Sequence, residues 1–249
     1  MIAWEERGTG APMVLVHGFT EDRHVWDRVV PLLESDFRCV LLDLRGHGES
    51  PAAEDQSALG MAADVAEVVR AAGIEEHPIV VGHSLGGVVV TAYATQAPTR
   101  AVVNVDQPLR VGDFARQLQP VGDLLRGPQF RDVIHQVFAT LGLEQLDAHD
   151  RQYVLDHVDH VSHEVVLGAW GLLLDAAPDE LDALIESMLP TIESPYLALH
   201  GSPPAESYDE WLHRFLPQAT LEVWDGVGHF ISFVAPQRFA DRVREFVGP

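Results

Sequence analysis

Residues 79–94 read IVVGHSLGGVVVTAYA, and this stretch decides the fold of the chain. The apolar run Ile79-Val80-Val81 predicts a buried strand, and the run Val88–Ala94 predicts a helix. Between them, Gly82-His83-Ser84-Leu85-Gly86 matches the pattern G-x-S-x-G of a sharp strand-to-helix turn. Such a turn is strained, and it needs glycines because a Cβ atom at either position would clash. We therefore predict that Ser84 is a nucleophile raised above the edge of a sheet. The alternative is a structural glycine turn.

Short apolar runs alternate with longer amphipathic stretches along much of the chain. This is the pattern of parallel strands joined by crossover helices. The predicted fold class is α/β, with a doubly wound and mostly parallel sheet. Strands are expected near residues 2–6, 12–17, 37–43, 78–82, 101–106, 195–200 and 220–224. Helices are expected near residues 25–34, 59–72, 84–96, 208–215 and 237–247.

The segment 107–190 interrupts this alternation. It is nearly all helical in pattern, and it is far too long to be a simple loop. We interpret it as a helical cap, or lid, inserted into a core domain made of residues 1–106 and 191–249. Breaks between its helices are expected at Gly127-Pro128 and Ala177-Pro178.

The composition excludes several classes of function. Acidic residues outnumber basic residues by 38 to 16, which gives a formal net charge of −22 at pH 7. Nucleic acids and anionic membranes are therefore poor partners. The charge is either that of a solvated surface or a field that attracts cationic substrates. All the basic residues are arginine, so a Walker-type phosphate loop and lysine Schiff-base chemistry are excluded.

The sequence shows no membrane-spanning or export signal and has a single cysteine. The chain has no run of 18 apolar residues, and no basic region followed by an apolar region at Met1. We therefore expect a cytoplasmic protein that does not enter the membrane. The single cysteine, Cys39, lies in an apolar run and is expected to be a small buried hydrophobe. The oligomeric state is open, with a homodimer as one alternative.

Three further motifs accompany the Ser84 turn in order along the chain. They are His17-Gly18-Phe19-Thr20, the D-x-R-G-x-G-x-S match at Asp43–Ser50, and Gly226-Val227-Gly228-His229-Phe230. Together the four motifs resemble the α/β-hydrolase family, over nearly all of the chain outside the cap. The resemblance implies a serine hydrolase whose oxyanion hole is formed by the backbone N–H groups of Phe19 and Leu85. Such donors stabilise charge that appears only in the tetrahedral state.

The chain has 13 histidines, and the family's order of motifs selects His229 as the general base. A neutral imidazole is suited to accept the serine proton near neutral pH. His17 and His83 flank the oxyanion hole and the nucleophile, so we expect them to be pocket walls. Three other histidines are spaced three residues apart: His157, His160 and His163. No carboxylate or cysteine framework fixes a geometry around them, so we expect no metal site.

The acid of the triad departs from the common pattern of the family. After the strand near residues 195–200 the family usually has Gly-x-x-Asp, but here the run is Gly201-Ser202-Pro203-Pro204. A minority of the family places the acid at the end of the strand that follows the nucleophile helix, where this chain has Asp106. We predict that Asp106 orients His229, with Glu206 and Asp209 as weaker candidates. The alternative for Asp106 is a capping or loop aspartate.

A serine at the nucleophile position indicates acyl transfer to water at an ester, lactone or thioester, without a cofactor. Relatives that open epoxides or displace halide carry aspartate there. Trp170 lies among small residues and is either a wall of the substrate site or a core aromatic of the cap. Phe19 and Phe230 are expected to form apolar walls. The expected substrate is a small or medium-sized, largely apolar ester or lactone, and long acyl chains are compatible.

Two other functions compete with ester hydrolysis. Cofactor-free dioxygenases of the same family share an acid at the position of Asp106 and use the His-Asp pair as a base. A ligand receptor that keeps the triad and signals through its cap is the third hypothesis. It is disfavoured because the cap sequence shows no apolar docking patch.

Overall fold

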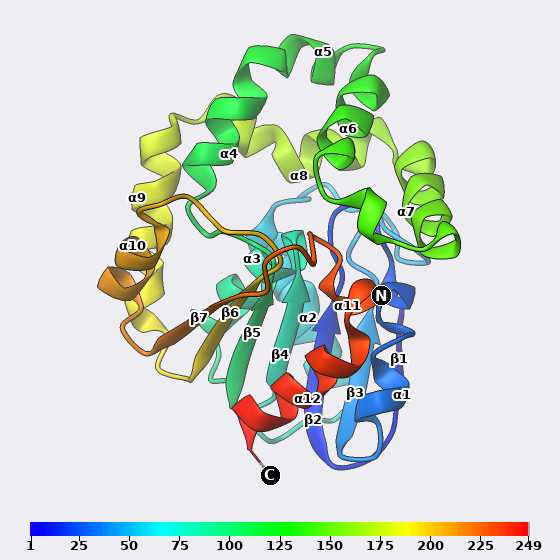
Figure 1. The fold of residues 1–249 in the computed structure, drawn as a ribbon, viewed down its shortest axis with the longest axis vertical. Coiled ribbons are helices and arrows are strands. Elements are labelled where there is room, and N and C mark those ends of the chain that lie inside the picture. Colours follow the sequence, from blue (N-terminus) through cyan, green and yellow to red (C-terminus); the bar gives the residue numbers. More distant parts are fainter. Residues whose placement is uncertain (249) are drawn as a thin grey trace.

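A seven-stranded sheet forms the centre of the computed structural model, which describes residues 1–248 (Figure 1). The strands are β1 (Trp4–Arg7), β2 (Ala11–Val16), β3 (Phe37–Leu42), β4 (Ile79–His83), β5 (Ala101–Val105), β6 (Tyr196–His200) and β7 (Ala219–Val223). Their spatial order is β1-β3-β2-β4-β5-β6-β7. Only β1 pairs antiparallel with its neighbour, and all other pairs are parallel. The predicted doubly wound, mostly parallel α/β sheet is confirmed.

Helices cover both faces of the sheet, which explains why the central strands are apolar at almost every position. Successive side chains of a strand point to opposite faces. In β2, Met13 and Leu15 therefore join one core, and Val14 and Val16 join another. The first core includes residues of η1 (Arg23–Trp26), α1 (Val30–Leu33), α11 (Ile231–Val234) and α12 (Pro236–Val247), and also residues of helices within 107–190. The second includes residues of α2 (Ala58–Ala71), α3 (Leu85–Ala94) and α10 (Tyr208–Phe215).

The helix expected near residues 25–34 is wrong as a single element. The chain forms the short 3-10 helix η1, then a break, and then α1. Pro31 lies in the first turn of α1, where its missing N–H costs nothing. Within a continuous helix its ring would clash with the carbonyl group of Asp27. The break is therefore built into the sequence.

The segment 107–190 is mostly helical and lies over the edge of the sheet where the parallel strands end (Figure 1). We call it the cap segment. Its longer helices are α4 (Val111–Leu118), α6 (Phe130–Ala139), α7 (Ala148–His160), α8 (His163–Asp175) and α9 (Pro178–Met188). Its shorter ones are η2 (Gln119–Val121), α5 (Gly122–Arg126), η3 (Leu143–Gln145) and η4 (Leu189–Thr191). The segment connects β5 to β6 directly, so it is positioned to cover anything bound at the strand ends.

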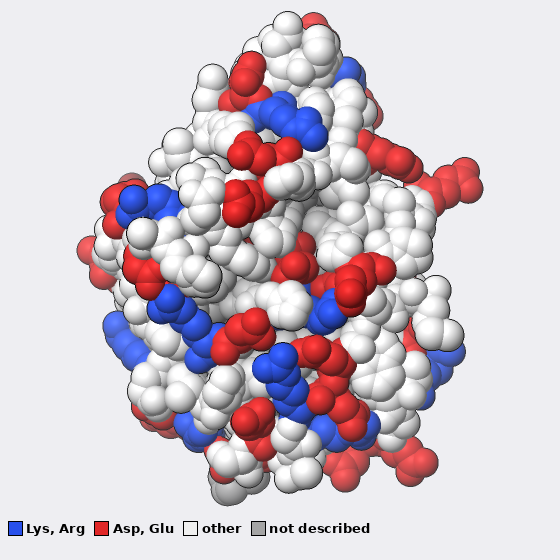
Figure 2. Space-filling view, turned by 90° about the vertical axis from the view of Figure 1, so that its right-hand side faces the viewer, with Lys and Arg blue, Asp and Glu red and all other residues white. Residues whose placement is uncertain are grey.

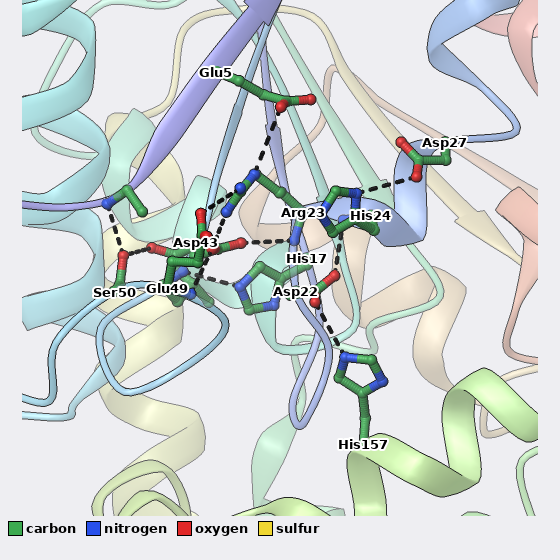
Figure 3. A network of polar contacts seen from close by, with 12 residues as sticks. Glu5, His17, Asp22, Arg23, His24, Asp27, Asp43, Glu49, Ser50 and His157 are labelled. Atoms are coloured by element: carbon green, nitrogen blue, oxygen red, sulfur yellow. Dashed lines mark hydrogen bonds and ion pairs between the residues drawn. The ribbon is translucent and has the colours of Figure 1, made fainter.

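Helix α7 is tied to the core through Asp22, just before η1 (Figure 3). The hydroxyl group of Tyr153 donates to Asp22 Oδ1 at 2.8 Å, and His157 Nε2 lies 3.1 Å from Asp22 Oδ2. Burial favours the neutral carboxyl group, but the hydrogen bonds from His157 and Tyr153 outweigh it and lower the pKa of Asp22. A charged carboxylate therefore links cap and core close to the predicted oxyanion loop.

The Asp43–Ser50 motif has a structural role. Asp43 Oδ1 accepts a hydrogen bond from the Arg23 backbone at 2.8 Å, and Oδ2 accepts one from the Glu49 backbone at 2.9 Å (Figure 3). Ser50 accepts from the backbone of Ala3 at 2.8 Å and donates to the carbonyl group of Asp43 at 2.7 Å. The motif thus joins the N-terminal strand, η1 and the loop after β3.

Charge is distributed over both parts of the molecule. On the face shown in Figure 2, acidic and arginine side chains are interspersed over the cap segment and the core. No basic patch gathers on this face. Among residues 1–248, none of the helices combines the length and apolar character needed to cross a bilayer.

Candidate active site

Ser84 occupies a strained turn between β4 and α3. Its backbone adopts φ +51° and ψ −121°, a conformation that a residue with a side chain rarely takes. A Cβ atom at Gly82 would lie 2.1 Å from the carbonyl oxygen of Gly86, and one at Gly86 would lie 2.4 Å from that of Val16. Both glycines are therefore required by close backbone packing. The turn leaves Ser84 half-buried on the wall of a cavity below the cap segment.

His229 lies in the loop between β7 and α11 and lines the same cavity as Ser84. Its Nδ1 atom is 2.6 Å from Oδ2 of Asp106. A carboxylate can only accept at that contact, so Nδ1 carries the proton and Nε2 is the nitrogen that can take one up. The backbone N–H of His229 donates to the carbonyl group of Leu141 in the cap segment at 3.2 Å. The cap segment thus helps to hold this loop.

Asp106 follows β5 and adopts a φ of +54°. Its Oδ1 accepts a hydrogen bond from the backbone of Gly201 at 2.7 Å, while Oδ2 accepts from His229. Burial alone would raise the pKa of Asp106, but the hydrogen bonds from His229 and Gly201 lower it. The weaker candidates do not reach His229: Glu206 is exposed, and Asp209 pairs with His213 at 2.9 Å.

The loops that carry these groups are pressed together at two glycines. A Cβ atom at Gly201 would lie 1.8 Å from the carbonyl oxygen of Gly228. We expect Gly201→Ala to lower the free energy of unfolding by about 1–3 kcal/mol and to displace His229. Urea unfolding and activity measurements check this. Gly171→Ala is the control because no atom lies within 4 Å of the added Cβ, and equal effects at the two sites would contradict the prediction.

The predicted oxyanion donors come from the two sides of Ser84. Phe19 and Leu85 both line the cavity with Ser84. Leu85 is the first residue of α3, so its N–H has no partner within the helix. The loop around Phe19 is fixed by a hydrogen bond of 2.6 Å from the Gly18 backbone to Glu21 Oε2. Both residues thus border the cavity beside Ser84.

His83 connects the predicted oxyanion loop to the loop of His229, a role that the sequence analysis missed. Its Nδ1 lies 2.9 Å from Glu21 Oε2, and its Nε2 lies 3.0 Å from the carbonyl oxygen of His229. With Glu21 ionised, both partners are acceptors, so these contacts fit an imidazolium ion with a proton on each ring nitrogen. Burial would lower the pKa of His83, but the Glu21 carboxylate raises it above the usual value. Burial likewise opposes ionisation of Glu21, but the interaction with His83 outweighs the effect of burial and lowers the pKa of Glu21.

This buried ion pair predicts a pH dependence of stability. The pKa of His83 is higher in the folded state than in the unfolded state. Its contribution to the free energy of unfolding is therefore complete below the unfolded pKa of about 6.5, and it is lost as the pH rises through the folded pKa. We expect the free energy of unfolding of the wild type to fall over that interval, and His83→Asn to show a shallower fall. Urea unfolding between pH 6 and 9 measures it.

The control for this experiment is His213→Asn, which removes an exposed histidine paired with Asp209. The pKa of His157 is also raised, so part of the wild-type slope must persist in every variant. Identical slopes for wild type and His83→Asn would show that His83 is neutral in the folded protein.

Of the expected pocket walls, Trp170 and Phe19 line the cavity, and their rings pack at a centroid distance of 4.5 Å. The same expectation was wrong for His17, His83 and Phe230, which are almost fully buried and do not line it. His17 accepts from the backbone of Leu44 at Nε2 and donates to the carbonyl group of Gly18, which fixes the strand end. The Phe230 ring packs edge-on against His229 at 5.2 Å.

The cavity has a volume of about 560 Å³, within the range of small-molecule sites.

The three regularly spaced histidines of α7 and α8 have separate partners: His157 meets Asp22, His160 meets the carbonyl group of Asp156, and His163 meets that of Leu125. Residues 1–248 contain no group of three side chains placed to hold a metal ion.

Comparison with known proteins agrees with this geometry. The family model of the alpha/beta hydrolase fold matches residues 11–139, which include β2, the Ser84 turn and Asp106. The chain belongs to this family.

Relatives of this alpha/beta hydrolase span its full length. A pimeloyl-[acyl-carrier protein] methyl ester esterase of Aeromonas hydrophila is 27% identical and covers 99% of both chains. An uncharacterized protein of Mycobacterium tuberculosis is 28% identical over 98% of this chain and 77% of its own length. A thermophilic esterase from Thermogutta terrifontis has a similar structure, with a TM-score of 0.82, 25% identity, and coverage of 99% and 92% of the two chains.

Proposed function

We propose that this alpha/beta hydrolase cleaves carboxylic esters or lactones through an acyl-enzyme on Ser84. One observation carries the proposal: Ser84 at its strained turn shares a cavity with His229, whose Nδ1 is bound at 2.6 Å by the half-buried carboxylate of Asp106. This arrangement leaves Nε2 as the base on the side of the imidazole opposite the acid. The names of the two esterases similar to this chain support the same type of substrate.

In the proposed reaction, Ser84 Oγ attacks the carbonyl carbon while His229 Nε2 takes its proton. The oxyanion is stabilised by the N–H groups of Phe19 and Leu85. Collapse breaks the bond to the leaving oxygen, which receives the proton from His229 and departs as an alcohol. Water then attacks the acyl group, giving its proton to His229, and Ser84 is released with a carboxylic acid. Asp106 stabilises the imidazolium that forms twice.

Serine rather than a carboxylate at the turn supports acyl transfer over epoxide opening or halide displacement, which need an alkyl-ester intermediate. A cofactor-free dioxygenase would use the His229–Asp106 pair without Ser84. Oxygen consumption that survives Ser84→Ala would favour that alternative.

A fluorophosphonate probe followed by intact-mass analysis tests the proposal. The expected result is a single adduct per chain in the wild type, no adduct in Ser84→Ala, and much slower labelling in His229→Ala. Labelling of Ser84→Ala at the wild-type rate would show that another residue reacts and would contradict the proposal.

A further inference from the structure

The cavity is elongated along one helix. Its floor follows one side of α3 and the C-cap residue of that helix, with lining residues Leu85, Val88, Thr91, Ala92 and Thr95. Thr95 lies eleven positions after Ser84, which corresponds to about 16 Å along a helix. The cavity therefore extends well beyond what the acyl group of a short ester would fill.

The two threonines on the floor of the cavity leave no free hydroxyl group for a bound molecule. The Thr91 hydroxyl donates to the carbonyl group of Gly87 at 2.6 Å and contacts the Tyr196 hydroxyl at 2.7 Å. The Thr95 hydroxyl donates to the carbonyl group of Ala92 at 2.8 Å. Both hydroxyls are thus satisfied within the protein. The far wall is provided by α9, with Ile185 and Met188.

The cavity has an apolar rim where it meets solvent. Three of its lining residues are leucines with large exposed fractions: Leu59 at 49%, Leu172 at 56% and Leu184 at 47%. They come from α2, α8 and α9, so the rim joins the core to the cap segment. An apolar ligand that reaches this point would cover side chains that are otherwise in contact with water.

The direction of the groove identifies which part of the substrate it holds. The leaving group must lie next to His229, because His229 gives it a proton. The backbone of His229 is bound to Leu141, and Gly228 lies against Gly142, so this side of the cavity belongs to the segment around residues 141–142. The stripe on α3 leads away from Ser84 toward α9 instead. The group held there is therefore the acyl chain.

We infer that the substrate carries an unbranched apolar acyl chain of about octanoyl to dodecanoyl length, which lies along α3 from Ser84 toward Thr95. The inference rests on the proposed function, since it assumes that Ser84 receives the acyl group. Each added methylene buries apolar surface in a preformed groove, so catalytic efficiency should rise with chain length.

The test measures kcat/KM for p-nitrophenyl esters from acetyl to dodecanoyl, below their micelle-forming concentrations. We expect the wild type to prefer octanoyl to dodecanoyl over acetyl by about 10–100-fold. Thr95→Trp fills the far end of the groove and should lower the dodecanoyl-to-butanoyl ratio at least about tenfold. Met188→Trp should do the same from the opposite wall. A ratio measured on one sample does not depend on how much of it is folded.

Leu124→Trp is the matched control, because Leu124 is an exposed leucine of the cap segment that does not line the cavity. It should keep the wild-type ratio. Efficiency that is flat or falls with acyl length, or wild-type ratios in Thr95→Trp and Met188→Trp, would overturn the inference while ester cleavage stands. A preference for long alkyl acetates would place the chain on the alcohol side and also overturn it. Failure to cleave any ester, with no labelling of Ser84, would reject the proposed function itself.

Discussion

Replacing Ser84 with alanine is expected to lower kcat for ester hydrolysis by a factor on the order of 10⁶. The substitution removes the only atom that can form the acyl-enzyme in the proposed mechanism, and the residual rate would come from the oxyanion donors and from binding. Steady-state hydrolysis of p-nitrophenyl esters measures the effect. The fold should survive, because the positive φ of residue 84 is imposed by the surrounding packing of Gly82 and Gly86.

Ser35→Ala serves as the control for this variant, since Ser35 is exposed and its hydroxyl group donates to the neighbouring Asp36. It should keep full activity. If Ser84→Ala retained more than about a thousandth of wild-type kcat, hydrolysis would have to proceed without the serine.

Asp106→Asn is expected to lower kcat by a factor on the order of 10⁴. An asparagine amide can present an N–H to Nδ1 of His229, which favours the imidazole tautomer with its proton on Nε2. That tautomer cannot accept the proton of Ser84. Labelling by a fluorophosphonate should slow in parallel with kcat, because both reactions need the same base.

The matched control is Asp209→Asn, which changes an exposed aspartate paired with His213. It should remain close to wild type. Near-full activity in Asp106→Asn, or a larger loss in Asp209→Asn, would reassign the acid.

The sheet and the chemical residues were predictable for particular reasons. The apolar run before Gly82 is buried on both faces, so it could only be a central strand. Asp106 could be found because a carboxylate directly after a buried strand needs a partner, and the structure brings it to His229. The break in the first helix could also have been predicted from Pro31.

The pocket walls were less predictable because a neighbour in sequence need not face the same way. His83 adjoins Ser84 but ends β4, and its side chain is fully buried against Glu21. Its partners are 62 and 146 residues away, so no local pattern reveals the ion pair. The glutamate that follows His17-Gly18-Phe19-Thr20 was the available signal. Phe230 faces the core for a similar reason, since it begins the turn into α11.

The most direct test of the acyl-enzyme is to trap it. The wild type and His229→Ala would be mixed with p-nitrophenyl octanoate, quenched in acid within the first turnovers, and digested with trypsin. Cleavage at Arg70 and Arg100 isolates Ser84 in one peptide. The proposed mechanism predicts that the wild-type peptide gains the mass of one octanoyl group on Ser84, and that His229→Ala gains it far more slowly. Hydrolysis of the ester with no acyl group on that peptide at any quench time would contradict it.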